Sequence, residues 1–389
     1  MLTRMPHLLI IDQHQFGYLT DTFRYCLHLR ERWDVAVVCW DYGRVRVALD
    51  GVRVSYVSRQ GSRPRRLARF IAAASRQLGS GRADIAFIVY FAGCSLLRAV
   101  PGGVPLIMDV RTGADRGGRA RRRFDDAVLR FESRVFAHRT IVSCSLAEKL
   151  QMQGRGIHIL PLGGDPLPLS PKSFETLRLL YVGTLFRRDL EKTVEGMGLY
   201  LRGSPEVSLT YDIVGGGSPE DRGRLEKAIA RSEFNDRIRF HGRIPNAELG
   251  PFLEQANVGV AFIPLVDYYD CQPSTKVFES LLAGMPVLAT ATSENRRVVT
   301  DENGILIPDT PEGFAEGLRR LAAHRHQFDS RRIRATVADY SWEKIVTDNL
   351  EPFLRERCRP RDAVGEVSAT RPAAEGQELT QNPHERSTP

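Results

Sequence analysis

The sequence predicts an α/β protein built from two parallel-sheet domains. Its 389 residues exceed what one ordinary hydrophobic core needs and suit two domains. Short apolar runs rich in β-branched residues alternate with helical patterns, which is typical of parallel sheets covered on both faces. This alternation occurs twice, on either side of a Pro- and Gly-rich segment at 160–172. We interpret that segment as an interdomain linker.

The first half of the chain carries the first set of alternating elements. Strands are expected at 7–12, 34–39, 52–57, 84–91, 105–110 and 140–143. Helices are expected at 21–32, 65–78, 120–137 and 146–153. We therefore assign residues 1–165 to a first Rossmann-like domain.

The second half repeats this architecture. Strands are expected at 177–182, 208–214, 238–241, 258–263 and 287–289, and helices at 189–201, 219–232, 247–255, 275–283, 294–300 and 311–323. We assign residues 173–340 to a second Rossmann-like domain. A last helical pattern covers 341–358, with Ser341 as its N-cap. Residues 359–389 are rich in Pro, Glu, Ser and Thr, and we expect them to be disordered.

Composition favours a globular cytoplasmic protein. The hydrophobic fraction is 42%, no window reaches eighteen apolar residues, and the N-terminus reads as a first core strand rather than a signal peptide. The six cysteines form no CxxC pair, so neither a zinc site nor a disulfide framework is predicted.

The formal net charge of +8 has a local origin. Arginines crowd the segment 111–130 at positions Arg111, Arg116, Arg119, Arg121, Arg122, Arg123 and Arg130, against only Asp115, Asp125 and Asp126. One interpretation is a solvated helix face. Another is attraction to an anionic membrane or a phosphate-bearing acceptor. Nucleic acid is a weaker third interpretation, since no nucleic-acid-binding motif accompanies the charge.

The most informative segment is 273–290, which reads PSTKVFESLLAGMPVLAT. A turn through Ser274 and Thr275 opens a helix that carries Lys276 and Glu279 and ends at Gly284. Free helix amides and a lysine suit a nucleoside diphosphate. The carboxylate suits the hydroxyls of a ribose. Taken alone, Lys276 and Glu279 could equally form a surface ion pair.

Two Gly-containing turns follow strands of the second half. Gly183 is followed by Arg187 and Arg188, and adjacent arginines suit a diphosphate. The turn from Gly215 through Gly216 does not fit the GxGxxG spacing, so it is very weak evidence for NAD. Both turns should lie at the carboxyl edge of the sheet, where ligands bind in such folds.

Several of these segments together resemble a known family. The segment 273–290, the turns YVGTL and IVGGG, the stretch RFHGRIPNAELGPFLEQANVGVAFIP and the closing YSW resemble GT-B fold, family 4-like retaining glycosyltransferases. The similarity covers roughly residues 177–345. The N-terminal half is similar only in pattern, through QHQFGYLTD at 13–21 and IMDVRTG at 107–113.

The resemblance implies roles for individual residues. It implies a GT-B fold whose last helix crosses back onto the first domain, and retention at the anomeric carbon. Glu279 matches the second Glu of an E-x7-E motif and would bind the donor ribose. The implied donor-binding set is Gly183, Thr184, Gly215, Gly216, Ile244, Ser274, Thr275 and Glu279, with Arg187, Arg188 and Lys276 as catalytic residues.

The sequence also departs from the family pattern. Cys271 stands where the first Glu of E-x7-E is expected, and Asp267 and Asp270 are its candidate replacements. Thr184 replaces an arginine that often follows the first glycine. On the acceptor side we expect Phe16 and Gly17 to form the floor of a cleft, and Asp109 and Arg111 to face it.

The expected activity is transfer of a sugar from a nucleoside-diphosphate sugar to a glycan or lipid-linked acceptor in polysaccharide biosynthesis. We expect no cofactor and no metal, because arginine and lysine supply the countercharge. We expect no nucleic-acid partner and a cytoplasmic location, compatible with the inner face of the membrane. Two alternatives stay open: a nucleotide-sugar epimerase of the same fold, and a non-catalytic GT-B scaffold in a polysaccharide assembly complex.

Overall fold

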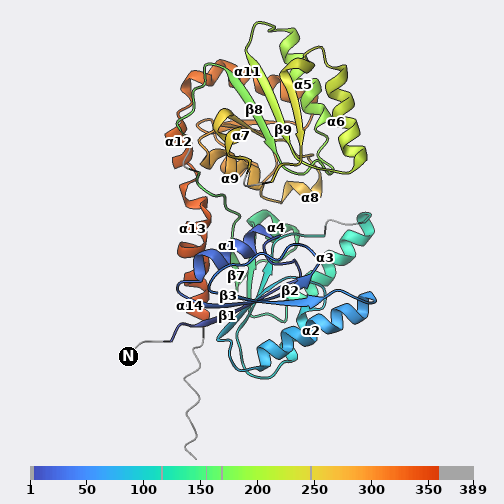
Figure 1. Cartoon of the computed structure of the whole chain (residues 1–389), viewed down its shortest axis with the longest axis vertical. Helices are drawn as coiled ribbons and strands as arrows, with labels where there is room; N and C mark the ends of the chain where they lie inside the picture. Colours follow the sequence, from blue (N-terminus) through green and yellow to red (C-terminus); the bar gives the residue numbers. More distant parts are fainter. Residues whose placement is uncertain (1–3, 115–116, 155, 168–169, 246–247, 359–389) are drawn as a thin grey trace, which may run out of the picture. The chain divides into compact units, whose positions relative to one another are not determined.

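Two parallel sheets, one in each half of the chain, organise the fold (Figure 1). The structure is a computed structural model that describes residues 4–114, 117–154, 156–167, 170–245 and 248–358. The predicted disordered tail at 359–389 lies outside the described residues. Both sheets are covered by helices, so each half has the Rossmann-like architecture that the alternating sequence pattern predicts.

The first sheet has seven strands in the order β3-β2-β1-β4-β5-β6-β7. Its strands are β1 His7–Asp12, β2 Asp34–Asp41, β3 Val52–Ser58, β4 Ile85–Val89, β5 Leu106–Val110, β6 His138–Ile141 and β7 Ile157–Ile159. Its helices are α1 Thr20–Leu29, α2 Arg63–Gly79, the 3₁₀ helix η1 Cys94–Ala99, α3 Arg119–Ser133 and α4 Cys144–Lys149.

The second sheet has six strands in the order β10-β9-β8-β11-β12-β13. They are β8 Leu177–Val182, β9 Leu209–Val214, β10 Ile238–Gly242, β11 Val258–Ala261, β12 Val287–Thr290 and β13 Gly304–Ile307. The helices are α5 Glu191–Arg202, α6 Pro219–Arg231, α7 Gly250–Gln255, α8 Asp267–Asp270, α9 Thr275–Leu282, α10 Asn295–Val298, α11 Pro311–His324 and α12 Ser330–Ala335.

Most expected elements are present within a few residues of the predicted bounds. The strands missed from sequence are β7, with the residues IHI, and β13, with GILI. Both lie at a sheet edge and are too short to show a period of two. The helices α8 and α12 were also missed, because segments of four and six residues span fewer than two helical turns.

Hydrophobic packing on both faces fixes the first sheet. On one face, Phe70 of α2 and Leu129 of α3 pack with Met108 of β5. On the other, Tyr25 of α1 packs with Leu8 and Ile10 of β1. In the second domain, side chains of the sheet pack with those of α5, α9 and α11 in one large hydrophobic core. Parallel strands buried on both faces explain the nearly continuous apolar runs in the sequence.

The C-terminal helical segment packs onto the first sheet, as the fold prediction expected. It comprises α13 Trp342–Lys344, the π-helix η6 Ile345–Leu350 and α14 Glu351–Arg357. Ser341 caps it, with its Oγ accepting a hydrogen bond from the Lys344 N–H at 3.3 Å. Trp342 is buried with Tyr25, their ring centroids 6.1 Å apart at 75°. The segment therefore belongs to the core of the first domain.

Each sheet has a switch point, where consecutive strands leave in opposite directions along the sheet. It lies between β1 and β4 in the first sheet and between β8 and β11 in the second. Ligands of open α/β sheets bind outside the carboxyl ends of the strands at such points. Among the described residues, no helix is long and apolar enough to cross a membrane.

Candidate functional site

The residues singled out around Gly183 and Lys276 meet at the switch point of the second sheet. Gly183 follows β8, and Lys276 and Glu279 lie on α9, which packs on β11 and β12. The sequence separates these residues by more than ninety positions, and the β8–β11 adjacency brings them together.

Glycines let Lys276 reach this edge of the sheet. Gly183 has φ +154°, and a Cβ at this position would lie 2.7 Å from Lys276 Nζ and overlap Lys276 Cε. A Cβ on Gly215 would overlap the Gly183 carbonyl oxygen. The lysine side chain therefore passes directly over the Gly183 backbone, and the turn after β9 supports that backbone from the other side.

Lys276 is influenced by a second cation, Arg188. The Lys276 Nζ itself lies 5.5 Å from the Tyr181 ring centroid. Loss of hydration, followed by the nearby Arg188 charge, lowers the pKa of Lys276 to about 8, and the carboxylate of Glu279 opposes this shift. Arg188 lies 4.2 Å from the Tyr269 ring centroid, and its buried Nε and Nη1 have no hydrogen-bond partner within the described residues. These free donors and crowded cations favour an anion at this place.

The loop that carries the arginines has a strained backbone. Arg187 and Asp189 adopt φ of +53° and +50°, in the left-handed region that side chains with a Cβ rarely occupy. Such strain is common at ligand sites. Arg187 is exposed and its guanidinium lies 5.0 Å from the Phe186 ring centroid, so it is free to reach a ligand above the sheet edge.

Glu279 faces solvent from inside a concavity. Its side chain is exposed, yet surrounding protein displaces enough water to raise the pKa of its carboxyl, an effect that Lys276 opposes. Gly164 of the linker packs against α9 here, because a Cβ on it would lie 3.2 Å from the Glu279 nitrogen. The backbone of α9 at Glu279 thus lies beside the linker.

The remaining donor-side predictions surround this centre. The exposed Thr184 accepts a hydrogen bond from the Phe186 N–H at 3.1 Å. A Cβ on Gly216 would lie 3.6 Å from the Arg243 Cβ. Ser274 is buried at the start of α9, Thr275 is half-buried, and Ile244 is half-buried against a small apolar cluster. Their roles stay predictions.

The position of Cys271 explains one departure from the family pattern. Its side chain is buried among first-domain residues such as Leu146, and its carbonyl oxygen accepts a hydrogen bond from Ser143 Oγ at 3.0 Å. Asp270 is engaged as well, because Ser293 donates to both of its carboxylate oxygens. Of the two proposed replacements, Asp267 lines a cavity. Cys271 itself is not among the residues that line this cavity.

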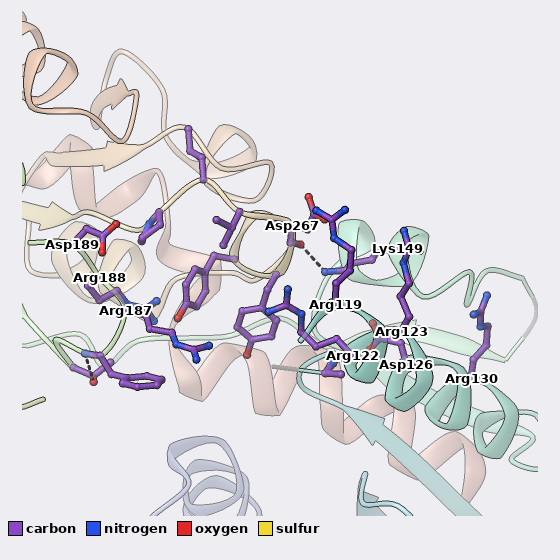
Figure 2. Close-up of a pocket in the computed structure, with 18 of the residues that line it drawn as sticks. Arg119, Arg122, Arg123, Asp126, Arg130, Lys149, Arg187, Arg188, Asp189 and Asp267 are labelled. Atoms are coloured by element: carbon purple, nitrogen blue, oxygen red, sulfur yellow. Dashed lines mark hydrogen bonds between the residues drawn. The ribbon is translucent and has the colours of Figure 1, made fainter. Parts of the chain in front are cut away.

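That cavity has a volume of about 1080 Å³ and a strongly basic wall (Figure 2). The loop after β8 contributes Arg187 and Arg188, and α8 contributes Asp267. Figure 2 shows further cations from α3 and α4, namely Arg119, Arg122, Arg123, Arg130 and Lys149. Lys149 donates a hydrogen bond to the Asp267 carbonyl oxygen at 2.6 Å. The cavity therefore joins the donor-side loop to the arginine-rich helix.

The acceptor-side expectations need correction. Asp109 has no exposed surface and accepts a hydrogen bond from Thr140 Oγ1 at 2.6 Å. Arg111 is also enclosed: its Nε bonds Asp21 at 2.7 Å and its Nη1 bonds the Leu160 carbonyl at 2.8 Å. The prediction that both face a cleft is therefore wrong for this structure. Their opposite charges neutralise one another inside the first domain, although burial still raises the pKa of Asp109 to about 6.

Phe16 and Gly17 follow β1, and their expected place at the floor of a cleft stays a prediction. Phe16 is buried in the core, and Gly17 has φ +87° with Val47 packed against it. Sequence reasoning missed the aromatic residues beside them. Tyr18 and Tyr42 are exposed, and the Arg44 guanidinium lies 4.8 Å and 5.6 Å from their ring centroids. No periodic signal marks this cluster, because it forms between two loops at the edge of the sheet.

Within the described ranges, no group of three or more His, Cys, Asp or Glu side chains is placed to hold a metal ion. The described site combines cations and backbone amides with the exposed carboxylates of Glu279 and Asp267.

Comparisons with protein families and solved structures show what this chain is similar to. Residues 176–324 match the family model described as glycosyl transferases group 1. A search of curated protein sequences found no match. Three solved structures are similar, and each match covers 90% of this chain. Sucrose-phosphate synthase from Thermosynechococcus elongatus has 18% sequence identity and a TM-score of 0.71, with 98% of that chain covered. HepE from Anabaena in complex with UDP and glucose has 14% identity, a TM-score of 0.69 and 100% coverage, and an α,α-trehalose-phosphate synthase (UDP-forming) from Burkholderia vietnamiensis has 10% identity, a TM-score of 0.64 and 99% coverage.

At these identities the structural similarity establishes the fold, and the family match covers the domain that holds Gly183, Lys276 and Glu279. The fold is GT-B. The second domain is a glycosyltransferase domain, and the protein is a glycosyltransferase.

A double-mutant cycle tests the contact between Lys276 and Gly183. Gly183→Ala should lower the free energy of unfolding by about 1–3 kcal/mol, because the new Cβ strains the backbone and overlaps the lysine. In Gly183→Ala/Lys276→Ala the overlap is gone, so the loss should be smaller than the sum of the single losses. Denaturant unfolding measures both quantities. Additive losses would show that Lys276 does not lie over Gly183.

Proposed function

We propose that the protein transfers a sugar from a nucleoside-diphosphate sugar to a glycan or lipid-linked acceptor, with retention and without a metal ion. The observation that carries this proposal is the pair of cations at the carboxyl edge of the second sheet. The Arg188 charge acts on Lys276, and the buried Nε and Nη1 of Arg188 have no hydrogen-bond partner in the part of the chain that the structure describes. A diphosphate would relieve their repulsion and accept those hydrogen bonds.

The surrounding geometry suits the rest of the donor. The exposed carboxylate of Glu279 can accept hydrogen bonds from two ribose hydroxyls. Gly183 has no side chain, so the Lys276 side chain can cross its backbone and reach the edge where the phosphates would lie. Ile244 would contact the base. The UDP and glucose bound by HepE and the UDP-forming reaction of the trehalose-phosphate synthase support a nucleotide-sugar donor for this fold.

The proposed chemistry follows from this arrangement. The bond between the anomeric carbon and the diphosphate oxygen breaks, and its electron pair leaves with the diphosphate. Lys276, Arg187 and Arg188 stabilise that growing negative charge from fixed positions. The acceptor oxygen forms the new bond on the same face, and its proton passes to a donor phosphate oxygen. No separate general base is then needed.

We further propose that the acceptor approaches from the first domain, across the cavity that both domains line. Tyr18 and Tyr42 offer aromatic rings to a sugar at this side. A cytoplasmic role in polysaccharide biosynthesis fits a glycan or lipid-linked acceptor.

Metal independence and retention are tested on the same reaction. Release of nucleoside diphosphate should continue in excess EDTA, since three basic side chains provide the countercharge. Proton NMR of the product should show the anomeric configuration of the donor. Loss of turnover that Mg²⁺ restores would refute the first property, and an inverted product would refute the second.

Donor binding is tested by thermal stabilisation with a panel of UDP-, GDP-, ADP- and dTDP-sugars. A ligand that binds the folded state raises the melting temperature in proportion to the logarithm of its concentration over its dissociation constant. Glu279→Ala should weaken binding by about 1.5–3 kcal/mol, which is the scale of hydrogen bonds to a charged group. The matched control is Glu195→Ala, which removes an exposed helical glutamate of α5.

One nucleotide class should stabilise the wild type and the Glu195→Ala control, but not Glu279→Ala. Equal stabilisation of Glu279→Ala would refute the ribose role of this residue. If no member of the panel stabilises the wild type, the donor proposal fails.

A further inference from the structure

We propose that one face of the first domain, formed by α2, η1 and α3, docks onto the surface of an anionic lipid membrane. The proposal depends on an exposed apolar stripe and the charges around it, and it stands independently of the reaction proposed above. A membrane-bound acceptor would connect the two, and only that connection rests on the proposed function.

The stripe runs along α3 and the turn that follows it. Phe124 and Phe131 are 62% and 69% exposed, and Val135 is 44% exposed. The spacing of seven and four residues places all three on one side of a helix with 3.6 residues per turn. The opposite side holds Leu129, which is buried in the first-domain core. The helix thus has two apolar sides, one packed against the first-domain core and one exposed to solvent.

The neighbouring 3₁₀ helix extends this surface. Leu96 of η1 is 59% exposed. Glu132 of α3 fixes η1 in place, because its Oε1 accepts hydrogen bonds from the Gly93 N–H at 2.8 Å and from Ser95 Oγ at 2.7 Å. η1 also packs against α2. Large exposed side chains gathered on a rigid layer indicate an interaction surface rather than isolated exposure.

The charge of this layer is one-sided. Helix α2 carries five arginines and no acidic residue, and α3 carries five arginines and three acidic residues. All three acids of α3 are engaged. Asp125 pairs with Arg121 at 2.9 Å, Asp126 accepts a hydrogen bond from the Ala114 N–H at 2.7 Å, and Glu132 holds η1.

Several arginines beside the stripe remain available. Arg123 and Arg134 are exposed, and neither forms an ion pair within the part of the chain that the structure describes. They flank the aromatic stripe on one side, and Arg121 flanks it on the other. An apolar side bordered by cations is the pattern of a helix that lies in the plane of a membrane interface. Each cation near an anionic surface adds roughly 1 kcal/mol of attraction.

The stripe favours a membrane over nucleic acid as the partner. Phosphates alone would satisfy the arginines, but they would leave Phe124, Phe131, Val135 and Leu96 in water. Acyl chains at the membrane boundary cover such side chains and contribute the hydrophobic term as well. Arg123, which borders the stripe, also lines the cavity (Figure 2). Docking would therefore bring the cavity close to lipid-linked molecules.

Flotation with vesicles tests the proposal on the full-length protein. The vesicles contain phosphatidylcholine alone, or phosphatidylcholine with roughly one third phosphatidylglycerol. The wild type should float with the anionic vesicles only, and more salt should weaken its binding by screening. Phe124→Ser/Phe131→Ser should partition at least about tenfold more weakly. Leu199→Ser, which alters an exposed apolar residue of α5, should bind like the wild type.

Circular dichroism melting of the double variant ensures that weak binding is not unfolding, because both phenylalanines are exposed and their replacement should leave stability unchanged. Failure of the wild type to float with anionic vesicles would overturn the proposal. So would equal flotation of a folded double variant. Tight binding of a short RNA with no vesicle binding would assign the face to nucleic acid instead. None of these results depends on turnover.

Discussion

Two positive charges confined at one sheet edge are the constraint on which the site depends. Lys276 and Arg188 repel one another, and burial removes the water that would otherwise screen them. The surroundings hold them in place. Gly183 leaves room for the lysine side chain, Gly215 packs against the Gly183 backbone, and the Tyr181 and Tyr269 rings lie beside the two cations. The two cations thus repel one another in the free protein. A bound anion would relieve this repulsion, and that relief would contribute to the free energy of binding.

Much of this arrangement could be predicted from sequence because it follows from sheet topology. The strands at 7–12 and 177–182 have the predicted bounds, and the turns after them must lie at the carboxyl edges. Gly183, Lys276 and Glu279 meet for this reason. The sequence could not predict which way a side chain points at the end of its strand. Asp109 and Arg111 end β5 as expected, yet Thr140 and Asp21 hold them inside the domain.

The segment from α8 to Cys271 shows a second limit of sequence reasoning. Its alignment with a family motif suggested a missing sugar-facing acid. The structure shows that Cys271 packs into the first domain and that Tyr268 and Gln272 hydrogen-bond Thr112. This segment connects the two domains: Cys271 packs into the first domain, whereas Asp267 lines the cavity. The arginines of α3 were visible in the sequence, but the exposed phenylalanines beside them became meaningful only in the folded chain.

The pH dependence of nucleoside-diphosphate affinity tests the central claim most directly. The free protein has its Lys276 pKa lowered to about 8, and a bound diphosphate should raise that pKa. The affinity should therefore be highest below about pH 8 and fall as the pH rises further, because Lys276 must then take up a proton on binding. Lys276→Met should bind about 10–100-fold more weakly with a flat profile over this range. A wild-type profile that is equally flat from pH 7 to 10 would contradict the account.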